Sequence, residues 1–369
     1  MKIPAKPRYS FSNVMPVNPR VKLNKAIRRM DQYLQWNNSC SMNSLRSPLP
    51  PDFRGDVQRI SEAKCLEYIW KIKTEEEINK RVDTCYRRNE IDISKIPNGI
   101  DAGYGEFPHM GAVGWLASDE TKEEYDDDYI FMCGSTLISE NFALTASHCE
   151  KAPPGNKLIQ PGALNPKIVR FGVERLYREE LYRPRQDAVI AAFIPYPDRD
   201  KIHKVHDLAL IQFEDPVYFT SFVRPSCIVP QSFKRAEKAT VSGWGVTKRT
   251  PSNSPAKELQ KTDVDILDNS LCNKKLRPRM KKSGWHGLIQ QICATNLAVQ
   301  TDACQGDSGG PLQETLKTGT ETPVYNVLGV VAFNFVCAST KVPSIYTKMD
   351  HKNYMDWIEN KVWGNNINE

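Results

Sequence analysis

The sequence predicts an all-β fold, because short apolar runs alternate with turn-rich segments from residue 131 onward. The runs are Phe131–Ile138, Ile168–Phe171, Leu208–Phe213, Thr240–Ser242 and Val327–Phe333. Several short strands separated by turns are typical of a barrel or a sandwich. The 369 residues include ten cysteines, an even number, which indicates disulfides and therefore secretion.

The N-terminal segment does not share this pattern. Residues 1–60 are rich in proline, asparagine, serine and arginine, so we expect them to be irregular or disordered. Between Ser61 and Ile72 apolar residues recur at helical spacing, which predicts a short helix or a partly helical linker. The first residues lack the apolar core of a signal peptide, and we expect the true start to be missing from this sequence.

The C-terminal segment predicts one helix. Asp350 is expected to be its N-cap and Gly364 to end it. One face of this helix is apolar and carries Tyr354, Trp357, Ile358 and Val362.

Composition excludes several classes of function. No apolar run reaches the roughly 18 residues of a membrane-spanning helix. The net charge of +6 is spread along the chain, whereas a nucleic-acid-binding protein gathers its bases in one patch. Cysteine pairs at zinc spacing are absent, so we expect neither a metal nor a cofactor. Charge gathers at Asp119–Asp128, with seven acids, and Lys274–Lys282, with six bases; we expect both to be surface loops.

Three segments carry residues suited to nucleophilic catalysis. His148 follows a short apolar run, Asp207 begins another, and Ser308 lies in Gly306-Asp307-Ser308-Gly309-Gly310. Glycines beside a serine allow a tight turn that exposes the hydroxyl and lets N–H groups approach a carbonyl. A histidine can take the serine's proton, and an acid can orient the histidine. Taken alone, the serine segment could also be a glycine-rich surface turn.

These segments, with Val241-Ser242-Gly243-Trp244-Gly245 and Tyr346-Thr347-Lys348, resemble the chymotrypsin-like (trypsin-type) serine proteases from about Ile96 to Glu369. The resemblance implies two six-stranded antiparallel β-barrels with a C-terminal helix. It makes residues 1–95 a mostly irregular pro-region or light chain and 96–369 the protease domain. It also implies His148, Asp207 and Ser308 as catalytic residues, with the backbone N–H groups of Gly306 and Ser308 as the oxyanion hole. The remaining histidines, including His109, are expected at the surface.

The same resemblance implies which residues determine substrate specificity. Asp302 is the expected floor of the substrate pocket, where a carboxylate would bind Arg or Lys; alternatively it bonds only its own loop. Phe333, Asn334 and Ser344 are the expected walls. Asn334 and Ser344 stand where the family has glycine, so we expect a narrowed pocket.

The resemblance also implies a site at which cleavage activates the protease. Cleavage after Lys95 by an upstream protease would free the amine of Ile96 to pair with Asp307. The alternative is an ordinary linker turn at this junction.

Disulfide pairing is also implied by the resemblance. Three bridges are expected within the protease domain: Cys133–Cys149, Cys272–Cys293 and Cys304–Cys337. For the remaining cysteines we expect Cys85–Cys227, which would tie the pro-region to the protease domain, and Cys40–Cys65, although sequence alone leaves the connectivity open.

The long cysteine-containing N-terminal segment resembles invertebrate clip-type cascade proteases, which are Snake- and Persephone-like. The clip region is incomplete, with only Cys40 as a remnant. The implied function is a secreted, extracellular zymogen endopeptidase in an immune or developmental cascade. Its expected partners are a protein substrate and a serpin-type inhibitor, and neither nucleic acid nor a membrane. A digestive trypsin-like protease and a non-catalytic homologue that serves as a binding scaffold stay open, as does calcium binding by the acids after Gly172.

Overall fold

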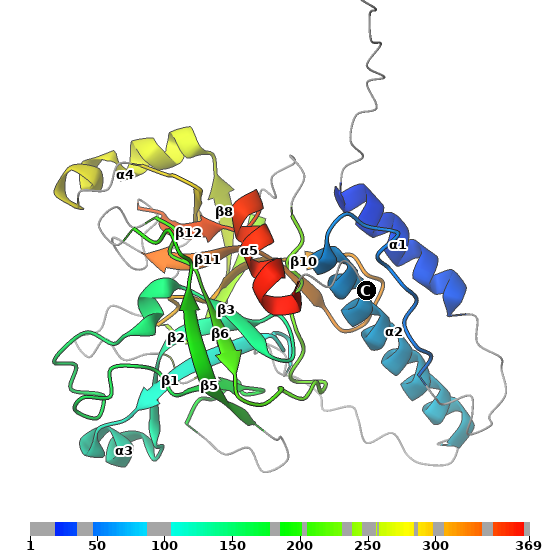
Figure 1. Cartoon of the computed structure of the whole chain (residues 1–369), viewed down its shortest axis with the longest axis horizontal. Helices are drawn as coiled ribbons and strands as arrows, with labels where there is room; N and C mark the ends of the chain where they lie inside the picture. Colours follow the sequence, from blue (N-terminus) through cyan, green and yellow to red (C-terminus); the bar gives the residue numbers. More distant parts are fainter. Residues whose placement is uncertain are drawn as a thin grey trace, which may run out of the picture.

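The computed structural model describes residues 19–34, 47–86, 105–177, 185–200, 205–230, 238–245, 256, 258–283, 287–297, 306–333 and 342–364. Its centre is a pair of closed antiparallel barrels, as predicted (Figure 1). The first barrel has the order β1-β2-β3-β6-β5-β4 and comprises β1 (Met110–Leu116), β2 (Tyr129–Leu137), β3 (Phe142–Thr145), β4 (Ile168–Phe171), β5 (Gln186–Pro195) and β6 (Ala209–Phe213). The second has the order β10-β11-β12-β9-β8-β7 and comprises β7 (Lys238–Gly243), β8 (Gln260–Leu267), β9 (Gln291–Thr295), β10 (Pro311–Leu316), β11 (Val324–Phe333) and β12 (Ser344–Lys348).

Strand β11 shows why the sequence has apolar runs in place of a strict alternation. Its residues are buried from Val324 to Ala332. Val327 and Val330 belong to the apolar cluster of the first barrel, whereas Leu328 and Val331 belong to that of the second. A strand that is buried on both faces reads as a continuous apolar run.

The two barrels meet closely where β2 approaches the segment before β10. The N–H of Gly134 donates to the carbonyl oxygen of Ser308 over 2.7 Å. A Cβ on Gly134 would lie 3.1 Å from the Cα of Gly310, so a side chain there would push the barrels apart. Glycine therefore sets the distance between β2 and the serine turn.

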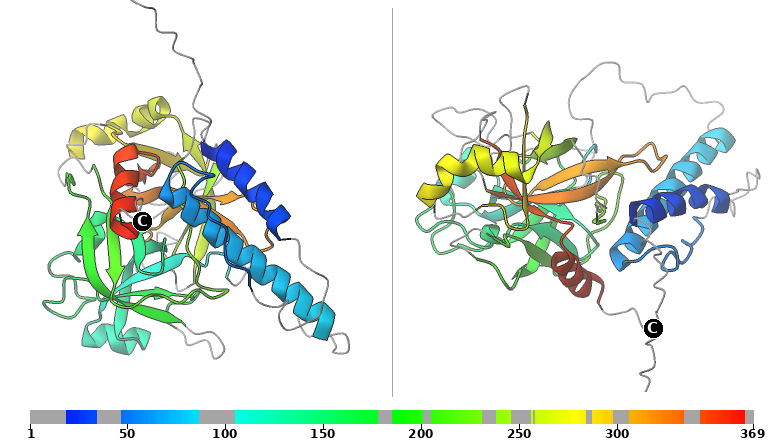
Figure 2. Two further views of the ribbon diagram at one scale, coloured as in Figure 1. Left: turned by 45° about the vertical axis from the view of Figure 1, so that its right-hand side comes forward. Right: turned by 90° about the horizontal axis from the view of Figure 1, so that it is seen from above.

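The N-terminal segment is more helical than the sequence predicts. Helix α1 (Pro19–Tyr33) forms where we expected irregular chain, and α2 (Ile60–Tyr86) is more than twice as long as the helix expected over 61–72. Figure 2 shows both helices together at one side of the barrels. They share a buried cluster with the second barrel, which includes Leu23, Met30, Leu66, Trp70, Leu316 and Val324. The apolar residues of α1 are therefore covered by α2, a partner that lies outside any local sequence window.

Polar contacts attach the start of α2 to helix α5 (Lys352–Trp363). The Arg59 guanidinium pairs with Asp356 and with Glu359, the latter at 2.9 Å. The hydroxyl of Ser61 also donates to Glu359. Helix α5 itself begins one residue later than expected: its N-cap is His351, and the expected cap Asp350 pairs with Lys348 at 2.8 Å.

The disulfides correct part of the predicted pairing. Cys133–Cys149 and Cys272–Cys293 are present as expected. Cys227 bonds to Cys65 on α2, so the expected Cys85–Cys227 and Cys40–Cys65 bridges are wrong. Packing of α2 on the second barrel brings Cys65 to Cys227, with their Cα atoms 5.0 Å apart. Cys40, Cys304, Cys337 and the Cys85 side chain lie outside the described residues.

Both charged segments contain helices. The acidic one forms α3 (Asp119–Tyr125), capped by the Ser118 hydroxyl, which accepts from the N–H of Thr121. The basic one forms the greater part of α4 (Asn269–Ser283). Among the helices that the structure describes, none combines the length and the apolar character needed to cross a bilayer.

Candidate active site

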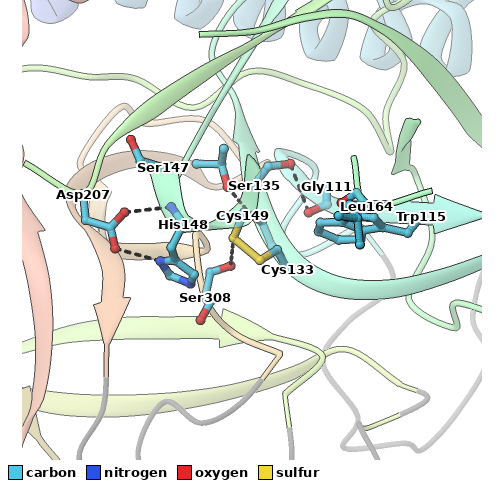
Figure 3. Close-up of a disulfide and its surroundings, with 12 residues drawn as sticks. Gly111, Trp115, Cys133, Ser135, Ser147, His148, Cys149, Leu164, Asp207 and Ser308 are labelled. Atoms are coloured by element: carbon cyan, nitrogen blue, oxygen red, sulfur yellow. Dashed lines mark hydrogen bonds and ion pairs between the residues drawn. A yellow bond between two sulfur atoms is a disulfide. The ribbon is translucent and has the colours of Figure 1, made fainter. Parts of the chain in front are cut away.

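His148 lies just beyond the end of β3. It sits in a short 3₁₀ helix, Ser147–Glu150, which is attached to β2 by the Cys133–Cys149 disulfide (Figure 3). The Ser147 hydroxyl donates to the carbonyl oxygen of Leu208, which ties this turn to the segment before β6. Two anchors on either side of His148 therefore hold its backbone against the first barrel.

Asp207 reaches His148 from the segment before β6. Its Oδ2 lies 2.7 Å from His148 Nδ1, and its Oδ1 accepts from the His148 backbone N–H over 2.9 Å (Figure 3). The carboxylate is largely buried, with 10% of its side chain exposed, whereas the imidazole is 35% exposed. This geometry fixes the ring's orientation and leaves its other nitrogen, Nε2, facing away from Asp207.

Two further residues hold the acid, and sequence reasoning missed both. The Thr347 hydroxyl donates to the Asp207 carbonyl oxygen over 3.0 Å. Arg199 donates from Nη1 to the Ser147 carbonyl oxygen over 2.8 Å, and its Nε lies 4.0 Å from Asp207 Oδ1. Thr347 belongs to the family motif at residues 346–348, which was a usable signal. Arg199 lies in the same β5–β6 connection as Asp207, and the antiparallel pairing of these two strands brings the two residues together.

Ser308 lies in a turn that leads into β10, and Figure 3 shows it beside the His148 ring. Gly306 and Gly309 on either side have φ of 102° and 81°, in the left-handed region that favours glycine. A Cβ on Gly309 would lie 2.2 Å from the Thr145 hydroxyl oxygen, so this turn also needs glycine for space. The predicted tight glycine turn is therefore present.

Asp307, next to Ser308, is buried against the segment that follows β7. Its Oδ1 accepts from the N–H of Gly245 over 2.8 Å. A Cβ on Gly243 or Gly245 would lie 2.1 or 2.3 Å from the carboxylate oxygens. Both glycines belong to the motif at residues 241–245, and their lack of side chains makes room for this carboxylate.

The remaining predicted site residues divide into two groups. Phe333 ends β11 and Ser344 begins β12, where Ser344 is buried, so these two predicted walls belong to adjacent paired strands. Asp302, Asn334, Lys95 and Ile96 lie outside the described residues.

We expected His109 at the surface, and this prediction is wrong, because its side chain is buried. Its Nε2 lies 2.5 Å from Gln313 Oε1, and it packs against Phe107 and Tyr325. Burial lowers the pKa of His109 to about 4. It therefore joins the start of the first barrel to β10 of the second, as a neutral ring.

Within the part of the chain that the structure describes, one cluster has metal-binding residue types. Side-chain atoms of Cys133, His148 and Cys149 lie within 4.8 Å of one another. The two sulfur atoms are bonded to each other, so neither is the thiolate that a zinc site needs.

Comparisons with known proteins identify the family of this chain. The family model described as Trypsin matches residues 96–358. "Serine protease snk" of Drosophila melanogaster is 31% identical over 308 residues, which cover 82% of this chain and 65% of that protein, slightly less than two thirds of its length. "Phenoloxidase-activating enzyme 1" of Spodoptera litura is 27% identical over 294 residues, or 76% and 71% of the two chains.

Among solved structures, neuropsin, a serine protease from mouse brain, matches with a TM-score of 0.52 and 23% identity, which supports the fold alone. It covers 70% of this chain and 96% of that one. The family match extends over most of the chain and includes both barrels and every residue of the His148, Asp207 and Ser308 cluster. The chain therefore belongs to the trypsin family of serine proteases.

Proposed function

We propose that His148, Asp207 and Ser308 are the catalytic triad of a secreted zymogen that cleaves proteins after Arg or Lys. The observation that carries this proposal is the 2.7 Å pairing of His148 Nδ1 with Asp207 beside the glycine turn of Ser308. With Asp207 ionised, Nδ1–H donates to the carboxylate, and Nε2 is free to accept the Ser308 proton.

The reaction then follows from these positions. Ser308 Oγ attacks the substrate carbonyl carbon as its proton moves to His148 Nε2. The N–H groups of Gly306 and Ser308 stabilise the oxygen that becomes negative. His148 gives the proton to the leaving amine, and a water molecule, deprotonated by the same ring, releases the acyl group.

Specificity is assigned to Asp302, with Phe333, Asn334 and Ser344 as walls. A carboxylate at the pocket floor favours Arg or Lys, because a buried charge needs an opposite partner. The burial of Ser344 supports a narrowed pocket, since its side chain takes up space that a glycine would leave open.

Activation is assigned to cleavage between Lys95 and Ile96. The new amine of Ile96 would pair with Asp307 and order the oxyanion hole. The burial of Asp307 next to Ser308 supports this role, because a buried carboxylate is stabilised by a cation. The Cys65–Cys227 disulfide would keep the N-terminal helices attached after cleavage.

The place of action is proposed to be extracellular, because the three described disulfides persist in oxidising compartments. The similarity to snk and to a protein named for activating phenoloxidase supports a role in a proteolytic cascade, with an upstream protease and a serpin-type inhibitor as partners.

The test is to incubate the purified chain with immobilised trypsin, to remove the trypsin, and to assay amide substrates that carry Arg, Lys, Phe or Ala before the cleaved bond. We expect hydrolysis of the Arg and Lys substrates only after this treatment. Asp302→Ser should lower their kcat/KM by on the order of 10²–10³-fold relative to Phe. Preference for Phe in the wild-type enzyme would contradict the assignment of Asp302.

A further inference from the structure

A pocket of about 450 Å³ opens beside the proposed catalytic residues. Ser308 and Gly306 are its only described lining residues from the second barrel. The rest of its described lining comes from the first barrel and its connections, including β2, helix α3 and residues 148–158. The pocket is therefore a first-barrel feature that ends at the nucleophile.

Its position determines which part of a substrate can enter it. The residue before the cleaved bond is assigned to walls on β11 and β12 of the second barrel. The leaving amine lies on the opposite side of the carbonyl, next to His148, which gives it a proton. Since the pocket touches both His148 and Ser308 from the first-barrel side, it faces the residues that follow the cleaved bond.

The wall of the pocket is chiefly apolar. Tyr125, Met132 and Leu158 are its accessible apolar residues, and the buried Ile130 and Phe131 lie behind them. Lys151 is the one charged residue among the described lining, apart from the titratable His148, and it is exposed at the rim. An apolar wall favours an apolar side chain and disfavours a small polar one, which leaves the wall in contact with water.

Contacts behind the wall hold it in place. The Tyr125 and Tyr177 rings pack with centroids 4.6 Å apart, and Tyr177 also packs against Phe131. On the other side, the Asn156 side-chain amide donates to the Met132 sulfur over 3.2 Å, and its oxygen accepts from the N–H of Leu158. The pocket is thus formed before a substrate arrives, which reduces the entropy lost on binding.

We propose that this pocket selects substrates with a bulky apolar residue, such as Leu or Phe, immediately after the cleaved bond. The inference rests on the proposed function, because it requires acyl transfer to Ser308. It adds a second determinant of specificity, supplied by helix α3 and residues 151–158, to the basic residue before the bond.

The test uses quenched fluorescent peptides with Arg before the cleaved bond and Leu, Phe, Ser or Glu after it. The trypsin-treated enzyme, with its active sites titrated, should cleave the Leu and Phe peptides with kcat/KM at least about tenfold above Ser. Leu158→Asp should reduce the Leu-to-Ser ratio of kcat/KM towards one. Leu271→Asp on α4 is the matched control, because Leu158 and Leu271 are 39% and 38% exposed; it should keep the ratio.

The outcomes separate the two proposals. An enzyme that cleaves all four peptides at equal rates, or a Leu158→Asp enzyme with an unchanged ratio, overturns the pocket assignment and leaves the triad standing. A preparation that cleaves none of the peptides, nor an Arg anilide without any residue after the bond, overturns the proposed function together with the pocket.

Discussion

The two ends of the β10–β11 hairpin are built by different physical means. At one end the Ser308 turn precedes β10, and Phe333 ends β11. At the other end Leu316 and Val324 are buried together with Leu66 of α2. The first end is held by backbone contacts that require glycine, and the second by apolar burial against the N-terminal helices.

Because of this difference, we expect the serine end to determine activity and the helical end to determine stability. The serine end is rich in glycine, so its side chains add little buried area and a change there alters function first. The helical end supplies buried apolar area and a disulfide, so a change there alters the free energy of unfolding first. Substitutions at the two ends should therefore have distinct effects on activity and on unfolding.

The largest effect is expected at the serine end. Ser308→Ala should lower kcat by on the order of 10⁶, because the nucleophile is lost. His148→Ala should cost a comparable factor, and the double variant little more, because the residues act as a unit. The measurement is amide hydrolysis after trypsin treatment, with thermal unfolding as the control. A Ser308→Ala protein that is still active, or one with a much lower melting temperature, would contradict the separation.

Activation should affect the serine end while leaving the helical end in place. Lys95→Gln should keep the chain inactive with a trypsin-like activator, because no Ile96 amine is formed to pair with Asp307. N-terminal sequencing of the active wild-type enzyme should find Ile96 first. The cleaved chains should separate on denaturing gels only with reductant, because Cys65 bonds to Cys227. Another first residue in the active form would refute this activation site.

Substitutions at the helical end should lower stability and leave activity unchanged. Leu66→Ala removes a fully buried side chain and should lower the free energy of unfolding by about 2–5 kcal/mol. Leu49→Ala is the control, because Leu49 in the same region is 90% exposed. Activity per titrated active site should stay unchanged in both variants. A loss of kcat in Leu66→Ala would show that the two ends are coupled.

An effect that depends on pH is expected at the barrel junction. His109 has a pKa of about 4 when folded, below the ordinary 6.5. The unfolded chain therefore binds more protons between these values, and stability should rise with pH across this window by on the order of 3 kcal/mol. In His109→Gln this contribution should vanish. Denaturant unfolding of both proteins at pH 4.5 and 7 isolates it; equal pH dependence would refute the buried neutral ring.

Local sequence patterns by themselves determined much of the site. The Ser308 turn needs glycine for its φ angles, so its motif carries its geometry in consecutive residues. The apolar runs likewise predicted strands such as β4, whose observed bounds match the run. The order of His148, Asp207 and Ser308 then indicated the family, which implied the pairing of His148 with Asp207.

Tertiary structure decided what depends on contacts between distant residues. Cys65 and Cys227 are 162 residues apart, and only the packing of α2 on the second barrel brings their Cα atoms within bonding range. The same packing makes α1 a helix, since its apolar residues need α2 to cover them. Arg199 likewise reaches the Ser147 carbonyl oxygen, and His109 reaches Gln313, across 52 and 204 residues of sequence. The spacing of residues along the sequence does not reveal such contacts, because they depend on how helices and strands pack together.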